Sequence, residues 1–227
     1  LSGMSIRAVV VYLEKSLARE RGTIAGSQAV EDLCRLLNQR IKDPVYHVTP
    51  EFLKNAWNSY TCEFTSYLYE FCEHMSGDPR FAYLGGMEKA SSIMQVLARP
   101  FSLPQIYGMF PYFGNKFASG SLEFRVVEVT PATATLAMKF SGRALRQFGP
   151  YRRRCAHLMC QAAQGIMAAV PVRVHGLPPA SLTELSCIAK DDEWCQWVIS
   201  WEGEKQGLWR RRVWQIVSGS GEGWSSL

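Results

Sequence analysis

Hydrophobic residues recur at helical spacing through the first hundred positions. In residues 5–21 the apolar positions Ile6, Val9, Val10, Leu13 and Leu17 fall on one stripe, which predicts an amphipathic helix. The same spacing predicts helices over residues 28–41, 50–75 and 81–97. The third of these helices carries a broad aromatic face, which we expect to pack in a core: Trp57, Tyr60, Phe64, Tyr67, Leu68 and Phe71.

The pattern changes after residue 100. Residues 103–117 are rich in proline, glycine and aromatic residues and predict a short helix followed by an irregular segment. Alternation of apolar and polar residues then predicts a β-hairpin from strands 121–129 and 133–140. A helix over 151–170 and a second hairpin, 181–189 with 194–201, follow. Helices segregated from antiparallel hairpins predict an α+β fold.

Length and composition indicate one sensory or ligand-binding domain over residues 1–202, with a helical part (1–99) and an α/β part (100–202). Residues 203–227 combine a basic-aromatic patch with a glycine- and serine-rich end, so we expect a linker or an appended terminus there, with a C-terminal output domain beyond it. A net charge of +5 is too mild to predict nucleic-acid binding. Without an apolar run of about 18 residues, we expect no membrane span and a cytoplasmic protein.

Three cysteines and one carboxylate gather late in the chain: Cys160, Glu184, Cys187 and Cys195. Seven cysteines in all, an odd number, fit a reducing compartment better than a disulfide framework. Thiolates and carboxylates are zinc ligands, and a structural zinc site takes four of them. Cys187 and Cys195 would be neighbours across the second hairpin, so the sequence allows a zinc site that joins helix to hairpin.

Two alternatives to this four-ligand set stay open. Glu184 and Cys187 are three residues apart, so on a regular strand they point to opposite faces, and a bulge is needed to bring them together. His157 lies three residues before Cys160 on the same predicted helix and could replace Glu184 as the fourth ligand. The cysteines could also be ordinary buried residues of the core.

The string Cys160-x4-Gly165, followed by Gly176 and then Glu184-x2-Cys187-x7-Cys195, resembles the 4-vinyl reductase domain family. That family includes the sensory domains of bacterial aromatic-responsive transcription activators. The resemblance implies a 4-vinyl-reductase-like fold and identifies Cys160, Glu184, Cys187 and Cys195 as zinc ligands. The first 150 residues are similar to N-terminal sensory regions of bacterial histidine kinases and cyclases, through residues 77–81 and 107–115.

These features together predict a ligand-sensing input domain of a bacterial signal-transduction protein, without enzymatic activity. Its output domain would be a kinase, a cyclase or a transcription activator, and the chain would form a homodimer. Its ligand would be a small apolar or aromatic molecule. The expected ligand-binding residues are Tyr107, Phe110, Tyr112, Phe113, Phe117, Phe124, Met138 and His157.

Three other functions remain as alternatives. The first is a protein-interaction or dimerisation module without a small ligand. The second is a tetrapyrrole vinyl reductase, which we rank low because no GxGxxG cofactor motif is present. The third is a haem-based gas sensor of the haem-nitric-oxide class. That class uses a Tyr-x-Ser-x-Arg propionate clamp, and the nearest string here, Tyr151-Arg-Arg-Arg, does not match it. The possible axial histidines for that class are His47, His74, His157 and His175.

Overall fold

The computed structural model describes residues 2–88, 98–118, 120–148 and 151–202. The helical half consists of α1 (Gly3–Arg21), α2 (Thr23–Asn38), the 3-10 turn η1 (Pro44–Tyr46), α3 (Pro50–Lys54), α4 (Cys62–Ser76) and α5 (Phe81–Glu88). The second half consists of α7 (Leu103–Phe117), β1 (Leu122–Val129), β2 (Thr133–Phe140), α8 (Gly142–Phe148), α9 (Arg152–His175), β3 (Ser181–Ser186), the 3-10 turn η3 (Ile188–Lys190) and β4 (Cys195–Ser200). The predicted α+β class is confirmed.

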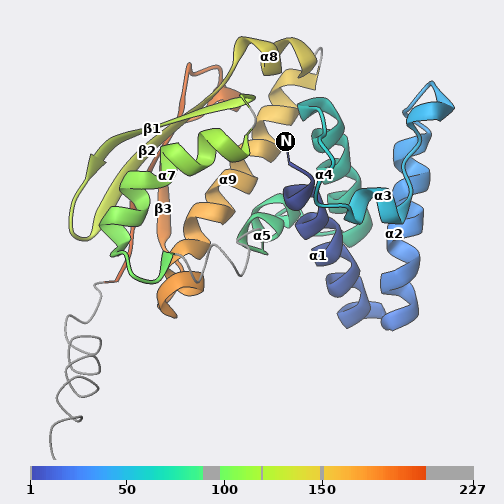
Figure 1. Cartoon of the computed structure of the whole chain (residues 1–227), viewed down its shortest axis with the longest axis horizontal. Coiled ribbons are helices and arrows are strands. Elements are labelled where there is room, and N and C mark those ends of the chain that lie inside the picture. The colour runs from blue at the N-terminus through green and yellow to red at the C-terminus, as the bar shows by residue number, and fades with distance from the viewer. Residues whose placement is uncertain (1, 89–97, 119, 149–150, 203–227) are drawn as a thin grey trace, which may run out of the picture.

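Helix α9 runs between the two halves, with α1 to α4 on one side and the sheet with α7 on the other (Figure 1). It packs along α5, and the crossing is close because α9 carries Gly165 there. A Cβ at position 165 would overlap the carbonyl oxygen of Tyr83 on α5. By length and composition α9 could cross a membrane, but 67% of its most apolar stretch is buried inside this fold, as in a core helix.

The four strands form one antiparallel sheet in the order β1-β2-β4-β3. Both predicted hairpins are present, and they join because β2 pairs with β4, with Met138 opposite Cys195. Alternate residues such as Leu136 and Trp197 are buried on the face that α7 and α9 cover. The join between the hairpins could not be predicted from local alternation.

The predicted helix over residues 50–75 is wrong as a single element. It is divided into α3 and α4, and Trp57, expected in the core, is 94% exposed between them. Polar side chains bond to the backbone here: the Asn55 carboxamide oxygen accepts the Trp57 N–H at 3.0 Å, and Thr61 caps α4. Such bonds compete with a continuing helix. The predicted continuation over 89–97 lies outside the described residues.

Residues 103–117, expected to be partly irregular, form a continuous helix despite Pro111 in its interior. Leu103, Tyr107 and Phe110 follow helical spacing and pack towards the sheet, where Phe110 meets Phe124 at 5.5 Å between ring centroids. Burial of this apolar face outweighs the weak local propensity. Helix α8 was not predicted.

Candidate functional site

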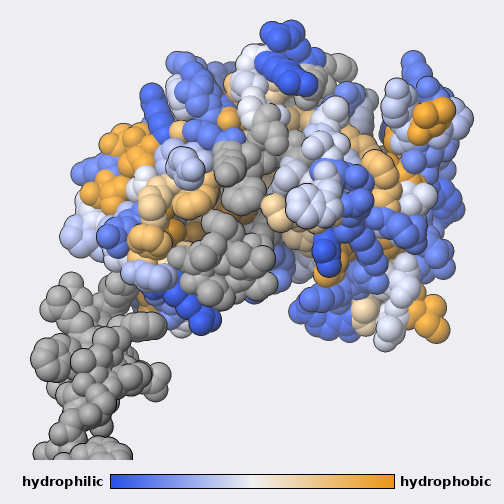
Figure 2. Space-filling model, in the orientation of Figure 1, coloured by the Kyte–Doolittle hydropathy of each residue, from blue (hydrophilic) through white to orange (hydrophobic). Residues whose placement is uncertain are grey.

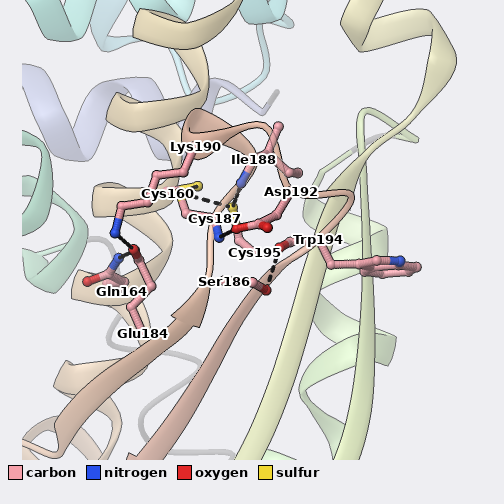
Figure 3. A network of polar contacts seen from close by, with 10 residues as sticks. All are labelled: Cys160, Gln164, Glu184, Ser186, Cys187, Ile188, Lys190, Asp192, Trp194 and Cys195. Atoms are coloured by element: carbon pink, nitrogen blue, oxygen red, sulfur yellow. Dashed lines mark hydrogen bonds and ion pairs between the residues drawn. The ribbon is translucent and has the colours of Figure 1, made fainter.

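The sulfur atoms of Cys160, Cys187 and Cys195 converge between α9 and the β3–β4 connection. The Cys187 sulfur lies 3.7 Å from that of Cys160 and 3.7 Å from that of Cys195. All three sulfurs lie within 4.8 Å of one another, and all three residues are buried. The three cysteines that the sequence singled out are therefore brought together, and we call them the thiol cluster (Figure 3).

Local geometry explains why the hairpin delivers two of these thiols. Strand β3 ends at Ser186, and Cys187 begins a tight turn in which its carbonyl oxygen accepts the Lys190 N–H at 2.8 Å. The Asp192 carboxylate accepts the Cys187 N–H at 2.8 Å. Asp191 completes the turn in the left-handed conformation, with φ 72°, which Asp tolerates better than most residues. The sequence analysis did not predict this role of Asp192. The signal for it was the pair of aspartates in the turn, because Asp side chains commonly bond to the backbone of tight turns.

The thiols influence each other's protonation. Hydrogen bonding with the Cys160 thiol, and then with the Cys195 thiol, holds the pKa of Cys187 below its ordinary value. Hydrogen bonding with Cys187, and secondly with Cys195, raises the pKa of Cys160. The Ile188 N–H also points at the Cys195 sulfur, at 3.3 Å. The cluster therefore favours one thiolate, at Cys187, with donors around it.

Glu184, the fourth predicted zinc ligand, is not part of the thiol cluster. A register shift follows it in the β3–β4 ladder, so a bulge is present, yet its carboxylate is bonded elsewhere. One oxygen lies 2.7 Å from the Lys190 ammonium, and the other accepts a hydrogen bond from Gln164 at 3.3 Å (Figure 3). His157, the alternative fourth ligand, is exposed on α9 and outside the cluster.

The expected ligand-binding residues are spread over two environments. Tyr107, Phe124 and Met138 are buried, and Phe110 and Phe113 are half-buried. Tyr112 and His157 are exposed, and the side chain of Phe117 lies outside the described residues. The buried rings contact one another, since Tyr107 stacks on Trp201 at 4.9 Å and its hydroxyl donates to the Met167 carbonyl oxygen at 2.8 Å.

A pocket of about 480 Å³ opens beside the thiol cluster. Its walls come from β1, the end of β2, α8, the start of α9 and the β3–β4 turn, and include Phe140, Leu145, Ile188 and Asp192. Ile188 and Asp192 also contact the cluster through their backbone or carboxylate. The pocket therefore reaches the residues next to the buried thiols.

Comparison with known protein families and with curated proteins found no match. Comparison of the fold with solved structures found H-NOX domains, the haem-nitric-oxide class. An H-NOX protein from S. oneidensis in the Fe(II) ligation state has a TM-score of 0.59 at 12% identity, covering 91% of this chain and 98% of that one. Fe(II) unliganded H-NOX from K. algicida gives 0.52 at 12% identity, covering 90% and 98%. A mutant of T. tengcongensis H-NOX gives 0.55 at 9% identity, covering 86% and 97%.

The prediction of a 4-vinyl reductase domain is therefore wrong, because the similar structures are H-NOX domains. It rested on the short stretch around the cysteines, whereas the H-NOX likeness extends over nearly the whole chain. The zinc prediction is also wrong. The similar structures are of Fe(II) proteins, and the carboxylate that would complete a zinc tetrahedron is paired with Lys190 and Gln164.

The H-NOX fold implies haem, and whether haem fits this chain depends on the ligands that its residues can supply. Haem iron needs an axial ligand, most often histidine. The chain has four histidines, and none lies on α7 or on a strand. His47, His74 and His157 are exposed, and a ring nitrogen of His175 lies 3.1 Å from the Phe101 carbonyl oxygen. A histidine-ligated haem between α7, the sheet and the helical half does not fit these residues.

The propionate clamp leads to the same conclusion. Lys139-x-Ser141-x-Arg143 is closer to the clamp pattern than the Tyr151 string, because it retains its serine and its arginine. The Ser141 hydroxyl, however, accepts the Ala144 N–H at 3.2 Å and so caps α8. Arg143 is exposed, and Lys139 pairs with Glu123 at 3.5 Å. Ser141 therefore caps α8, Arg143 faces solvent, and Lys139 pairs with a residue of β1.

Proposed function

We propose that this chain is a ligand-sensing input domain with the H-NOX fold, acting in a signal-transduction protein. The observation that carries the proposal is the extent of the likeness, which covers 91% of this chain and 98% of an H-NOX protein. The similar proteins from S. oneidensis are described in Fe(II) states with NO and with CO, so those proteins bind small ligands. Transfer of a sensing role to this chain is an inference from fold.

The sensed molecule in this proposal is a small apolar compound bound without histidine-ligated haem. Helix α7 and strand β1 present half-buried apolar side chains that pack against the same core: Ile106, Phe110, Val126 and Val129. Apolar colour gathers over these two elements in the space-filling view (Figure 2). Ligand sites are mostly apolar with few polar groups, and this surface has that composition.

Haem-based gas sensing is the second candidate, because all the similar structures named above are H-NOX proteins. The test is expression with added haem precursor, followed by absorption spectroscopy and pyridine haemochrome analysis. We expect far less than one haem per chain, since all four histidines lie away from α7 and the strands. Haem bound at one per chain, with a Soret band lost on replacing a single histidine by alanine, would contradict the proposal and establish the second candidate.

Native mass spectrometry of the same preparation tests the apolar-ligand proposal directly. We expect a small organic molecule to be retained, or recovered after incubation with a panel of simple aromatic compounds. Phe110→Ala should weaken that retention, whereas Tyr112→Ala, an exposed aromatic on the same helix, should leave it unchanged. Equal retention of the small molecule by both variants would contradict a ligand site on the apolar surface that α7 forms with β1, here called the α7 surface.

A further inference from the structure

Exposed large hydrophobic side chains gather in one short segment of the helical half. Of the eleven such side chains among the described residues, four lie between positions 45 and 57: Val45, Tyr46, Phe52 and Trp57. Trp57 is the most exposed of the eleven, at 94%. Apolar side chains that gather at one place on a surface mark an interaction site, whereas single scattered ones need no explanation.

An apolar groove of about 530 Å³ lies next to this segment, between α2 and residues 47–50, which lead into α3. We call it the α2 groove, and its lining includes Cys34, Arg35, Asn38 and Val48. We propose that two copies of this chain dimerise here, with Trp57 of each copy in the α2 groove of the other. A two-fold axis brings the same patch of both copies together, so a projection and a recess on that patch meet reciprocally.

The projection is held in place by the loop that carries it. The Asn55 carboxamide oxygen accepts the Trp57 N–H at 3.0 Å. The Asn58 carboxamide donates to the Phe52 carbonyl oxygen at 2.9 Å. The Gly3 N–H of α1 donates to the Asn58 carbonyl oxygen at 2.6 Å, which ties the loop to the helical half. A loop that is ordered before binding loses less conformational freedom on association, so Trp57 is presented as an anchor.

The recess is also formed before association. Asn38 of α2 accepts the Val48 N–H at 2.8 Å and donates to the Val48 carbonyl oxygen at 3.0 Å, so two hydrogen bonds join the walls. Cys34 and Val48 are buried, and most of the lining is apolar. At the rim, Arg35 pairs with Asp32 of the same helix at 2.7 Å. An apolar lining with its rim charge balanced within the chain suits an indole ring.

The positions of the two features favour a second copy as the occupant. Helix α3 rises by about 8 Å. Pro50 at its start lines the groove, and Trp57 follows its last residue by three positions. Because Trp57 is 94% exposed, it does not fill the groove of its own chain. Projection and recess are therefore neighbours on one patch, as a closed two-fold pair requires. Helices α2 and α3 lie at the end of the molecule away from the sheet, which leaves the α7 surface free (Figure 1).

Sedimentation velocity of the full chain over a concentration series measures the association. We expect a monomer–dimer equilibrium without larger species, since a reciprocal contact closes the pair. Trp57→Ala should raise the dimer dissociation constant by at least about 30-fold, the factor that one hot-spot residue carries. Tyr112→Ala removes a 69% exposed aromatic side chain of α7 and should leave the constant unchanged. A chain that stays monomeric at the highest concentration would overturn the proposal and leave the patch to a partner of another kind.

A mixture of two variants tests whether Trp57 enters the groove of the other copy. Gln39→Trp places an indole at the α2 groove from within the same chain and should block it, while Trp57 stays free. Trp57→Ala lacks the projection, so neither variant forms a reciprocal contact with itself. Mixed together, they retain one of the two contacts. Their heterodimer should be tighter than either variant with itself and weaker than the unmodified dimer, and its absence would overturn reciprocal docking.

Hydrogen exchange of the unmodified chain gives a result that does not depend on how the variants fold. Raising the concentration through the dimer dissociation constant should slow amide exchange in α2 and in residues 45–58, with α7 and the sheet unchanged. Slower exchange in the sheet or α7 alone would place the dimer contact elsewhere and overturn the proposal.

Discussion

Single residues decide how closely the elements of this domain approach. Gly165 is the clearest case, because the Tyr83 carbonyl oxygen occupies the space that a Cβ would need. The same glycine ends the string Cys160-x4-Gly165, where the missing side chain lets α9 approach another element. The partner, α5, could not be inferred from the string, because it lies far earlier in the chain.

Gly165→Ala should destabilise the domain by about 1–3 kcal/mol, the usual cost of overpacking a core. Helix propensity alone favours alanine, so a loss of stability would report the backbone contact. The matched control is Gly108→Ala on α7, where a Cβ meets nothing within 4 Å. That change should raise stability by up to about 1 kcal/mol. Urea unfolding of both variants measures the difference, and equal effects would contradict the close crossing.

At the scale of elements, capping and side-chain bonding explain where the sequence-based boundaries were wrong. The aromatic pattern over residues 50–75 predicted one helix, but Thr61 starts a new helix by accepting the Phe64 N–H at 3.1 Å. Periodicity reports which residues share a face and does not show whether the backbone between them is continuous.

Thr61→Ala should lower the free energy of unfolding by about 1 kcal/mol, because the α4 N-terminus loses its capping oxygen. Thr61→Ser keeps a hydroxyl at the same position and is the control, with stability close to that of the unmodified chain. Thermal unfolding followed by circular dichroism compares the two. If Thr61→Ala were as stable as Thr61→Ser, the α3–α4 break would not depend on this cap.

At the scale of the whole molecule, α9 connects the features that matter for function. It carries Cys160 to the β3–β4 turn, lies along α5, and forms an ion pair from Arg154 to Glu73 of α4 at 2.9 Å. The thiol cluster and the α7 surface belong to the same half of the fold but are separate sites.

Local pattern was sufficient for much of this protein: the α+β class, helices α1, α2 and α9, the two hairpins, and the meeting of Cys187 with Cys195 across a turn. These depend on spacing within a few residues, where backbone periodicity places side chains. Tertiary structure alone decided the single sheet, the continuous α7 and the H-NOX likeness, because these arise from contacts between residues far apart in the chain. It also decided the make-up of the thiol cluster, because the partners of Glu184 on α9 and in the turn hold its carboxylate away from the three sulfurs.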